Sequence, residues 1–465
     1  MPNPAQLLEL GNAAVVAPAG HGKTEIIAAA SGLAKRSLIL THTHAGVHAI
    51  RARLKRLGVP SHKAPVDTIA GWCTRYASSF PGAANPPKGL PQTPAQWEQL
   101  YQGVRLALQV RAVRDVIAAS YDRIFIDEYQ DCPASQHLLS VQLSGIVPTV
   151  IFGDPMQGIF EFAGATLSWP EEILTRFPLA GTLDTPHRWA GKNPALGEWV
   201  AETREKLKRG EAIDLRDQRI SYRQTDDAFD MRALFEGYEE IEGSLAAIHC
   251  SKAICYNLAR ASNGGYQAIE EIAANRLRGF ANGWDHAEPP DGRREAILSL
   301  IKECFNRKQS AVGDAIDPAI ETARQELREV SLGLNDGNGA AAAAKVLAMC
   351  KRVPGWRLFR YELWRDAERA MGELAAGRAP TLLDAVVRVR ERASRTGRTL
   401  SRRIVSTPLL LKGLEFDHVV IPDARHFLAE DFANAKLFYV AISRATRSLR
   451  ICSPDPVIQF ERPRL

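Results

Sequence analysis

The chain has 465 residues, of which 45 % are hydrophobic, so it is long enough for about two to four globular domains. Its longest apolar runs are far shorter than the ~20 residues of a membrane-spanning helix, and the first residues show no signal-peptide pattern. The seven cysteines include no CxxC pair, which argues against a zinc ribbon, an iron–sulfur cluster or a disulfide framework. The net charge of +6 favours a polyanionic partner only weakly, and the cytoplasm is the expected location.

Short runs rich in β-branched residues alternate with helix-like stretches, which is typical of a parallel α/β sheet. The first set lies at residues 13–17, 38–40, 124–126 and 150–152. A second set lies at residues 246–249, 404–406, 419–421 and 449–452. Roughly 140 residues with almost no strand pattern interrupt the second set, and a proline-rich loop marks a smaller insertion in the first half. We therefore predict two α/β cores, each with an insertion, the second insertion being helical.

The segment between the first expected strand and the helical stretch after it has the pattern of a phosphate-binding loop. It consists of Ala17, Pro18, Ala19, Gly20, His21, Gly22, Lys23 and Thr24. The two glycines let backbone N–H groups turn toward phosphate oxygens, and the helix N-terminus adds its positive end. In this pattern Lys23 reaches the β- and γ-phosphates and Thr24 binds Mg²⁺. The alternative is a strand–helix turn without a ligand, and the strand–loop–helix context argues against it.

Two adjacent carboxylates, Asp127 and Glu128, follow the expected strand at residues 124–126. At the end of such a strand Asp127 can hold Mg²⁺, and Glu128 can orient the attacking water as a base. Alone, the pair is equally compatible with an acidic turn. With a phosphate-binding loop upstream, we interpret it as the Walker B strand of an ATPase.

Six segments, one of which includes Asp127 and Glu128, resemble the motifs of UvrD-like superfamily 1 helicases. DEYQD at residues 127–131 is similar to the family's DEFQD, and GDPMQGIF at 153–160 is similar to its GDxxQSIY. The others, in family order, are THTHA at 41–45, LDTPHR at 183–188, KGLEF at 412–416 and YVAISRA at 439–445.

This resemblance implies an α/β fold with two RecA-like P-loop NTPase domains, each a parallel sheet with flanking helices. The first domain would cover residues 1–180, with a small insertion at about 72–118. The second would cover 181–265 and 401–465, and a helical insertion would occupy 266–400.

The resemblance also implies roles at a site for ATP and Mg²⁺. Gln6 would read the adenine, Glu415 would bind the ribose, and Gln157 would sense the γ-phosphate. Arg188 and Arg444 resemble the two arginines that the family presents to the γ-phosphate. Guanidinium groups there stabilise the charge that phosphoryl transfer spreads over the oxygens. For an arginine taken alone, a surface ion pair is the commoner outcome.

The family binds single-stranded DNA, with bases stacked on aromatic side chains. Phe160 and Phe162 occupy the stacking positions, and core packing is the alternative for both. The other expected contacts to phosphates or bases come from Thr41, His42, Thr43, His44 and Thr68, with Trp72 as a weaker candidate. Seven arginines between Arg388 and Arg403 would contact duplex phosphates or a partner protein, or form a solvated helical face.

Three residues depart from the family pattern: Ala163 replaces an arginine, His187 a tyrosine and Leu409 a histidine. These departures favour translocation over processive unwinding. We expect an ATP- and Mg²⁺-dependent translocase or helicase that moves 3′ to 5′ on single-stranded or tailed duplex DNA, in DNA repair or antiphage defence.

The alternative function is a nucleic-acid-sensing ATPase that regulates a partner nuclease without processive unwinding. Compact UvrD-like proteins of this kind resemble the helicase subunit of the Gabija antiphage system, which works beside an OLD-type nuclease. A plain P-loop kinase or GTPase would leave the segments at 153–160 and 412–445 unexplained.

Overall fold

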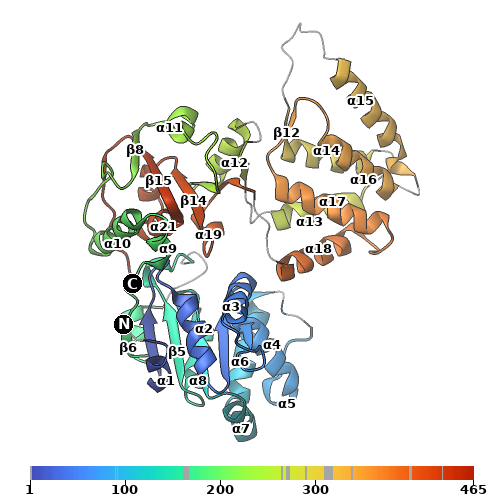
Figure 1. The fold of residues 1–465 in the computed structure, drawn as a ribbon. Helices are drawn as coiled ribbons and strands as arrows, with labels where there is room; N and C mark the ends of the chain where they lie inside the picture. Colours follow the sequence, from blue (N-terminus) through green and yellow to red (C-terminus); the bar gives the residue numbers. More distant parts are fainter. Residues whose placement is uncertain are drawn as a thin grey trace. The chain divides into compact units, whose positions relative to one another are not determined.

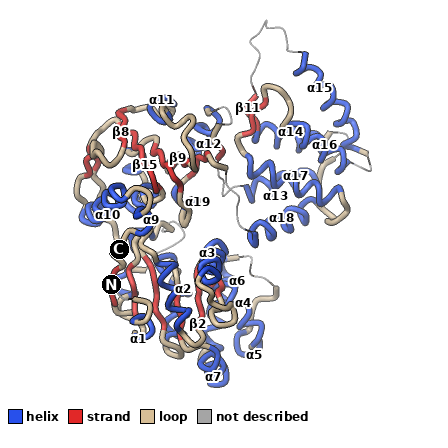
Figure 2. The backbone as a smooth tube through the Cα atoms, in the orientation of Figure 1, coloured by secondary structure: helices blue, strands red, loops and turns tan. Residues whose placement is uncertain are grey.

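The computed structural model describes residues 3–89, 91, 93–160, 167–262, 265–268, 273–288, 291–307, 318–336, 339–396, 401–431 and 433–465. The chain forms two compact units. Unit one comprises residues 1–224, 411–419 and 423–465, and unit two comprises 225–410 and 420–422. Figure 1 follows the chain from its N-terminus, and Figure 2 separates helix from strand. Among the described residues, no helix has both the length and the apolar character that crossing a membrane requires.

Unit one contains a six-stranded parallel sheet with the order β3-β2-β4-β5-β1-β6. Its strands are β1 (Ala13–Val16), β2 (Ser37–Thr41), β3 (Val66–Thr68), β4 (Arg123–Ile126), β5 (Thr149–Gly153) and β6 (Leu179–Thr182). Within β2, Leu38 and Leu40 belong to one hydrophobic core and Ile39 to another, because successive side chains of a strand point to opposite faces. Both faces are therefore covered, which explains the nearly continuous apolar runs in the sequence.

Helices cover the two faces of this sheet (Figure 1). One core includes side chains of α2 (Lys23–Leu33) and α3 (His44–Arg56). The other includes side chains of α4 (Ile69–Ser79), α6 (Pro94–Ala107) and α8 (Ala134–Ser144). Loops follow the carboxyl ends of the strands, and ligands of parallel α/β sheets bind at this edge.

Helix α5 (Pro81–Ala84) packs closely against α6. A Cβ atom at Gly103 would lie 1.9 Å from the backbone oxygen of Ala84. Helix α6 begins with a capping box, in which Thr93 and Gln96 exchange side chain–backbone hydrogen bonds. The close contact between Gly103 of α6 and the Ala84 carbonyl of α5 requires glycine at position 103.

A second six-stranded sheet has the order β10-β13-β9-β14-β15-β8. Its strands are β8 (Ser221–Gln224), β9 (Leu245–Ile248), β10 (Gln267–Ala268), β13 (Arg403–Ser406), β14 (Phe416–Ile421) and β15 (Ala445–Ser453). The predicted fold class is confirmed: the protein is mixed α/β, with two six-stranded parallel sheets flanked by helices, consistent with two RecA-like domains. The predicted domain boundaries stay a prediction.

Unit one also holds α9 (His187–Ala190), α10 (Pro194–Arg209) and α21 (Asn434–Ile442). Every residue from Ala435 to Ile442 is buried, as expected of a core helix that is apolar on most sides. Helix α21 packs against α10.

The shorter elements of the chain include α1 (Gln6–Glu9), α7 (Arg111–Ser120), α11 (Met231–Phe235), α12 (Lys252–Ala261), α19 (Pro408–Leu411), α20 (Arg425–Leu428), β7 (Ile213–Asp214) and β16 (Val457–Ile458).

The inserted part of unit two is mainly helical and has its own hydrophobic core. Its helices are α13 (Ala273–Asp285), α14 (Gly292–Cys304), α15 (Pro318–Ser331), α16 (Gly339–Cys350), α17 (Tyr361–Ala375) and α18 (Leu382–Thr396). Strands β11 (Phe305–Arg307) and β12 (Trp356–Leu358) form a small antiparallel pair. The Asp285 carboxylate accepts hydrogen bonds from the Leu382 and Leu383 N–H groups, both at 2.9 Å, and so fixes the start of α18.

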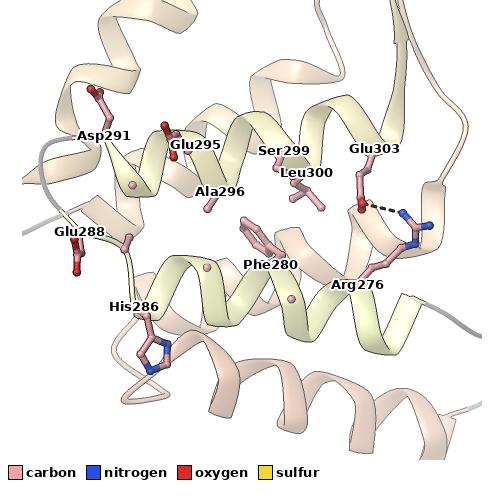
Figure 3. A pocket seen from close by; sticks show the side chains of 14 residues that line it. Arg276, Phe280, His286, Glu288, Asp291, Glu295, Ala296, Ser299, Leu300 and Glu303 are labelled. Atoms are coloured by element: carbon pink, nitrogen blue, oxygen red, sulfur yellow. Dashed lines mark hydrogen bonds and ion pairs between the residues drawn. The ribbon is translucent and has the colours of Figure 1, made fainter.

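A cavity of about 780 Å³ lies between α13 and α14 (Figure 3). Phe280 and Leu300 line it, and at one end Arg276 donates to Glu303 at 2.8 Å. None of the residues predicted for ATP or DNA lines this cavity.

Candidate nucleotide and DNA site

The phosphate-binding loop runs from the end of β1 to the start of α2. Gly20 and Gly22 have φ values of +77° and +81°, in the left-handed region that glycine adopts without strain. A Cβ on Gly20 would lie 2.7 Å from the Cβ of Arg188, and a Cβ on Gly22 would lie 2.9 Å from the ring of His187. Both glycines are therefore required by backbone conformation and by space.

Contacts to the sheet and to α21 hold the loop. The Ala17 N–H donates to the Gly153 carbonyl at 2.8 Å, and the Ala19 N–H donates to the Tyr439 hydroxyl at 3.0 Å. His21 is buried, with Nδ1 2.9 Å from the Ala19 carbonyl, and burial lowers its pKa. These contacts fix the position of the loop against β5 and α21.

Lys23 lies between the two Walker B carboxylates. Its Nζ is 2.9 Å from Asp127 Oδ1, and it also forms an ion pair with Glu128. Burial acts to lower the pKa of Lys23, but the two carboxylates outweigh burial and raise that pKa. Burial likewise acts to raise the pKa of Glu128, but Lys23 and Lys412 hold it well below its usual range. Glu128 is therefore ionised at neutral pH.

The backbone of Glu128 is left-handed, with φ +57°. Its N–H donates to Asp127 Oδ1 at 2.8 Å, and its Oε2 accepts from Gln130 Nε2 at 2.5 Å. The side chain is thus oriented by its neighbours, as a base that positions water must be.

The residues around Lys23 fit ATP with Mg²⁺. Thr24, in the first turn of α2, and the buried Asp127 provide a hydroxyl and a carboxylate, and Mg²⁺ prefers such hard oxygen ligands. The helix N-terminus and the two glycines of the loop suit phosphate oxygens. The predicted ATP and Mg²⁺ site is therefore chemically consistent with the geometry.

Arg444 is the most deeply buried of the predicted arginines, at 1 % exposure. Its guanidinium donates to the Val440 carbonyl at 2.9 Å and the Leu414 carbonyl at 3.1 Å. It also donates to Ser443 Oγ at 2.8 Å and to Gln157 Oε1 at 3.5 Å. All four of these partners are neutral, so no carboxylate forms an ion pair with this guanidinium among its hydrogen-bond partners, and the site suits an anion.

Arg188 lies beside this group. It donates to the Ser443 carbonyl at 2.5 Å, forms an ion pair with Glu415 at 3.1 Å, and its backbone N–H donates to the Gly20 carbonyl at 3.0 Å. Burial, and then the charge of Arg188, lower the pKa of Arg444 to about 9. The two guanidinium groups therefore repel each other, which an anion between them would relieve.

Lys412 joins the Walker B segment to the segment after β5. Its Nζ is 2.6 Å from Asp131 Oδ1 and donates to the Gln157 carbonyl at 2.6 Å. It also lies 5.2 Å from the centre of the Phe160 ring. Burial raises the pKa of Asp131 to about 6, although Lys412 opposes that shift.

These contacts connect all six residues predicted for catalysis, and they include Glu415, which was predicted to bind the ribose. The six are Lys23, Asp127, Glu128, Gln157, Arg188 and Arg444. Gln6 is different. It is exposed at the start of α1, and its Oε1 accepts from the Asn3 N–H at 2.9 Å. Its role toward adenine stays a prediction.

Several residues predicted for DNA are not accessible in the structure. Thr41 is fully buried, and Thr68 is 5 % exposed. The Thr68 hydroxyl caps α4 by accepting from the Gly71 N–H at 2.9 Å. Trp72 is fully buried and stacks on Tyr76 with ring centres 4.2 Å apart. The Thr68 and Trp72 side chains thus stabilise α4, and none of the three residues presents a surface to DNA.

Other predicted DNA residues lie at the surface. Thr43 and His44 are exposed, although the Thr43 hydroxyl caps α3 by accepting from the Gly46 N–H at 3.0 Å. Phe160 is 36 % exposed. His42 is half-buried, with Nε2 3.3 Å from Cys132 Sγ. Phe162 and Ala163, and the side chains of residues 390–400 in the arginine run, lie outside the described part of the chain.

The sequence assigned no role to four residues that the structure connects to this site. Three of them, Asp131, Lys412 and Tyr439, belong to the segments that resemble family motifs, so the sequence could have identified them. Arg204 lies on α10, outside every such segment, and nothing in the sequence separates it from the other charged residues of that helix.

The sheet order, the glycine loop and the two carboxylates after β4 are consistent with RecA-like domains of the P-loop NTPase class. Residues 93–178 match the family model of the UvrD/REP helicase N-terminal domain. This match includes Asp127, Glu128 and Gln157, and it supports a UvrD-like superfamily 1 helicase, a class that uses ATP and acts on DNA. A search of curated proteins found no significant match.

Proposed function

We propose that the chain is an ATP- and Mg²⁺-dependent motor that translocates 3′ to 5′ along single-stranded DNA. The observation that supports this most is the set of contacts that bring distant segments together around the proposed nucleotide site. Arg188 reaches the backbone of Gly20, and Arg444 reaches the side chain of Gln157. Lys23 pairs with Glu128. The direction of movement rests on the resemblance alone.

In this proposal each side chain acts on a particular charge. Lys23 exchanges its carboxylate partners for phosphate oxygens when nucleotide binds, which frees Glu128 to orient the attacking water. Arg188 and Arg444 stabilise the charge that builds up on the γ-phosphate oxygens. Thr24 and Asp127 would hold Mg²⁺, which supplies neutralisation of the phosphate charge when bound.

Contacts also connect the proposed DNA surface with the nucleotide. Phe160 is exposed enough to stack on a base and lies over Lys412. Lys412 donates to the backbone of Gln157, whose side chain accepts from Arg444. A shift of Phe160 on binding DNA would therefore reach the γ-phosphate sensor Gln157 through one cation–π contact and one hydrogen bond.

Steady-state ATP hydrolysis with and without single-stranded DNA tests the proposal. We expect strong stimulation by DNA, and loss of at least about 100-fold in kcat for both Lys23→Ala and Glu128→Gln. Lys55→Ala, on the exposed face of α3, is a control outside the nucleotide loop and should keep its activity. Hydrolysis that ignores DNA would contradict a DNA-coupled motor.

Strand displacement on a 3′-tailed duplex separates the two candidate functions. Displacement driven by ATP supports a helicase. ATPase activity with neither displacement nor movement along single-stranded DNA supports the alternative, a nucleic-acid-sensing subunit that acts on a partner nuclease of the OLD type, in antiphage defence or DNA repair. The departures Ala163 and Leu409 motivate this second candidate.

A further inference from the structure

Arg204 is a buried arginine on α10, outside all the segments that resemble family motifs. Its side chain is 8 % exposed, and its Nη2 lies 2.6 Å from Asp154 Oδ1. Asp154 follows β5 and is fully buried. The Arg204 Nη1 donates to the Glu205 carboxylate at 2.7 Å. Burial acts to lower the pKa of Arg204, but Asp154 outweighs burial and raises it, so the guanidinium is charged at all working pH values.

Asp154 in turn orients two residues of the proposed site. Its Oδ2 accepts from Gln157 Nε2 at 3.0 Å, which fixes the amide that faces Arg444. Its backbone N–H donates to Gln130 Oε1 at 3.0 Å, and Gln130 donates to Glu128 at 2.5 Å. A displaced Asp154 would therefore disturb both the γ-phosphate sensor and the proposed base.

A second contact of Arg204 leads to the phosphate-binding loop. Its Cζ lies 5.9 Å from the centre of the Tyr439 ring, within the range of a cation–π contact. The Tyr439 hydroxyl accepts from the Ala19 N–H at 3.0 Å. Arg204 thus contacts the two side chains that hold the sensor and the loop.

We propose that Arg204 is a positioning residue for ATP hydrolysis, which fixes Asp154 and Tyr439 and through them Gln157, Glu128 and the loop at Ala19. This proposal rests on the proposed function. A purely structural role is the competing explanation, because removing one partner of a buried ion pair also destabilises a protein. Rate and stability must therefore be measured separately.

The experiment compares the full-length chain with Arg204→Met, Arg204→Lys and Arg209→Met. Arg209 is the matched control, since it ends the same helix and pairs with Glu211 at the surface. We expect Arg204→Met to lower kcat about 10- to 100-fold, because a misplacement of about 1 Å can cost that much, with KM for ATP changed less than about threefold. Arg204→Lys should recover part of kcat. Arg209→Met should match wild type.

Each rate is taken at a temperature where circular dichroism shows the variant folded. Hydrogen exchange is measured on the same proteins without nucleotide. We expect faster exchange in peptides covering residues 17–24 and 153–158 for Arg204→Met, and unchanged exchange there for Arg209→Met. Unchanged exchange in these peptides, or wild-type kcat in folded Arg204→Met, would overturn the positioning role. If wild type itself hydrolyses no ATP, the proposed function fails, and the exchange data still decide about Arg204.

Discussion

Glu128 is held in a backbone conformation that its side chain does not favour. Its φ of +57° lies in the left-handed region, which costs an L-residue roughly 1–2 kcal/mol. In this conformation the carboxylate contacts both Lys23 and Gln130. The strain is therefore the cost of placing the proposed base between the phosphate-binding lysine and the amide that orients it.

Two substitutions of Glu128 distinguish the energetic cost of its backbone strain from the effect of losing its carboxylate. We expect Glu128→Gly to be more stable than Glu128→Ala by about 1 kcal/mol, because both remove the carboxylate and only glycine relieves the left-handed strain. Urea denaturation measures the difference. Ala118→Gly, at an exposed position of α7, is the control and should instead lose about 0.5–1 kcal/mol. Equal stability of the two variants at position 128 would contradict the strain argument.

His42 should make stability depend on pH. Burial, and then the charge of Lys412, lower its pKa from 6.5 to about 4. Between these values the unfolded histidine is protonated and the folded one is not, so stability is full above pH 6.5 and is lost as pH falls toward 4. We expect wild type to lose up to about 3 kcal/mol more than His42→Gln over that interval. Urea denaturation at several pH values tests this, and parallel profiles for the two proteins would refute it.

At the scale of elements, apolar strands were easier to predict than polar ones. The runs at 13–17, 124–126 and 150–152 became β1, β4 and β5, because a strand covered on both faces must be apolar throughout. Strand β8 reads Ser-Tyr-Arg-Gln at the edge of its sheet, so it carries no such signal. The pair β11–β12 has three residues in each strand, too few for a periodic pattern.

The site was predictable where its residues belong to local motifs. Lys23, Asp127 and Glu128 were found because loop, strand and helix follow one another along the chain. Arg204 could not be found, because its importance depends on packing against Asp154 and Tyr439, which lie far from it in sequence. The buried positions of Thr41 and Thr68 also depend on packing, and a motif alone does not reveal them.

The contact between α5 and α6 gives a prediction about packing. Gly103→Ala would place a Cβ 1.9 Å from the Ala84 carbonyl oxygen, so the two helices must move apart. We expect a loss of at least about 2 kcal/mol, as for other overpacked cores. Gly82→Ala, whose Cβ would meet nothing within 4 Å, is the control and should change stability by less than about 1 kcal/mol. Thermal denaturation distinguishes the two variants. A wild-type Tm for Gly103→Ala would contradict the prediction, because α5 would then move away from α6 at little cost in stability.

For the whole molecule, the net charge of +6 predicts that binding of single-stranded DNA depends on salt. Each phosphate contact releases counterions, so three to five contacts would weaken binding about 20- to 100-fold between 50 and 200 mM salt. Fluorescence anisotropy with a labelled oligonucleotide measures the slope. The Tm of the free protein over the same range serves as the control and should change little by comparison. A binding constant independent of salt would argue against contacts to the phosphate backbone.

The hydrogen bond from Ala19 to Tyr439 joins residues 420 positions apart, and this separation has a consequence during protein synthesis. The loop at residues 17–24, with its strand and helix, leaves the ribosome well before Tyr439. At about 5–20 residues per second, roughly 20–80 s pass before Tyr439 and Arg444 follow. During that interval the nascent chain carries Lys23 but lacks Tyr439, which holds the loop, and Arg444, which we propose to act on the γ-phosphate. Synthesis therefore completes the proposed nucleotide site only when the segment at residues 439–444 has been made.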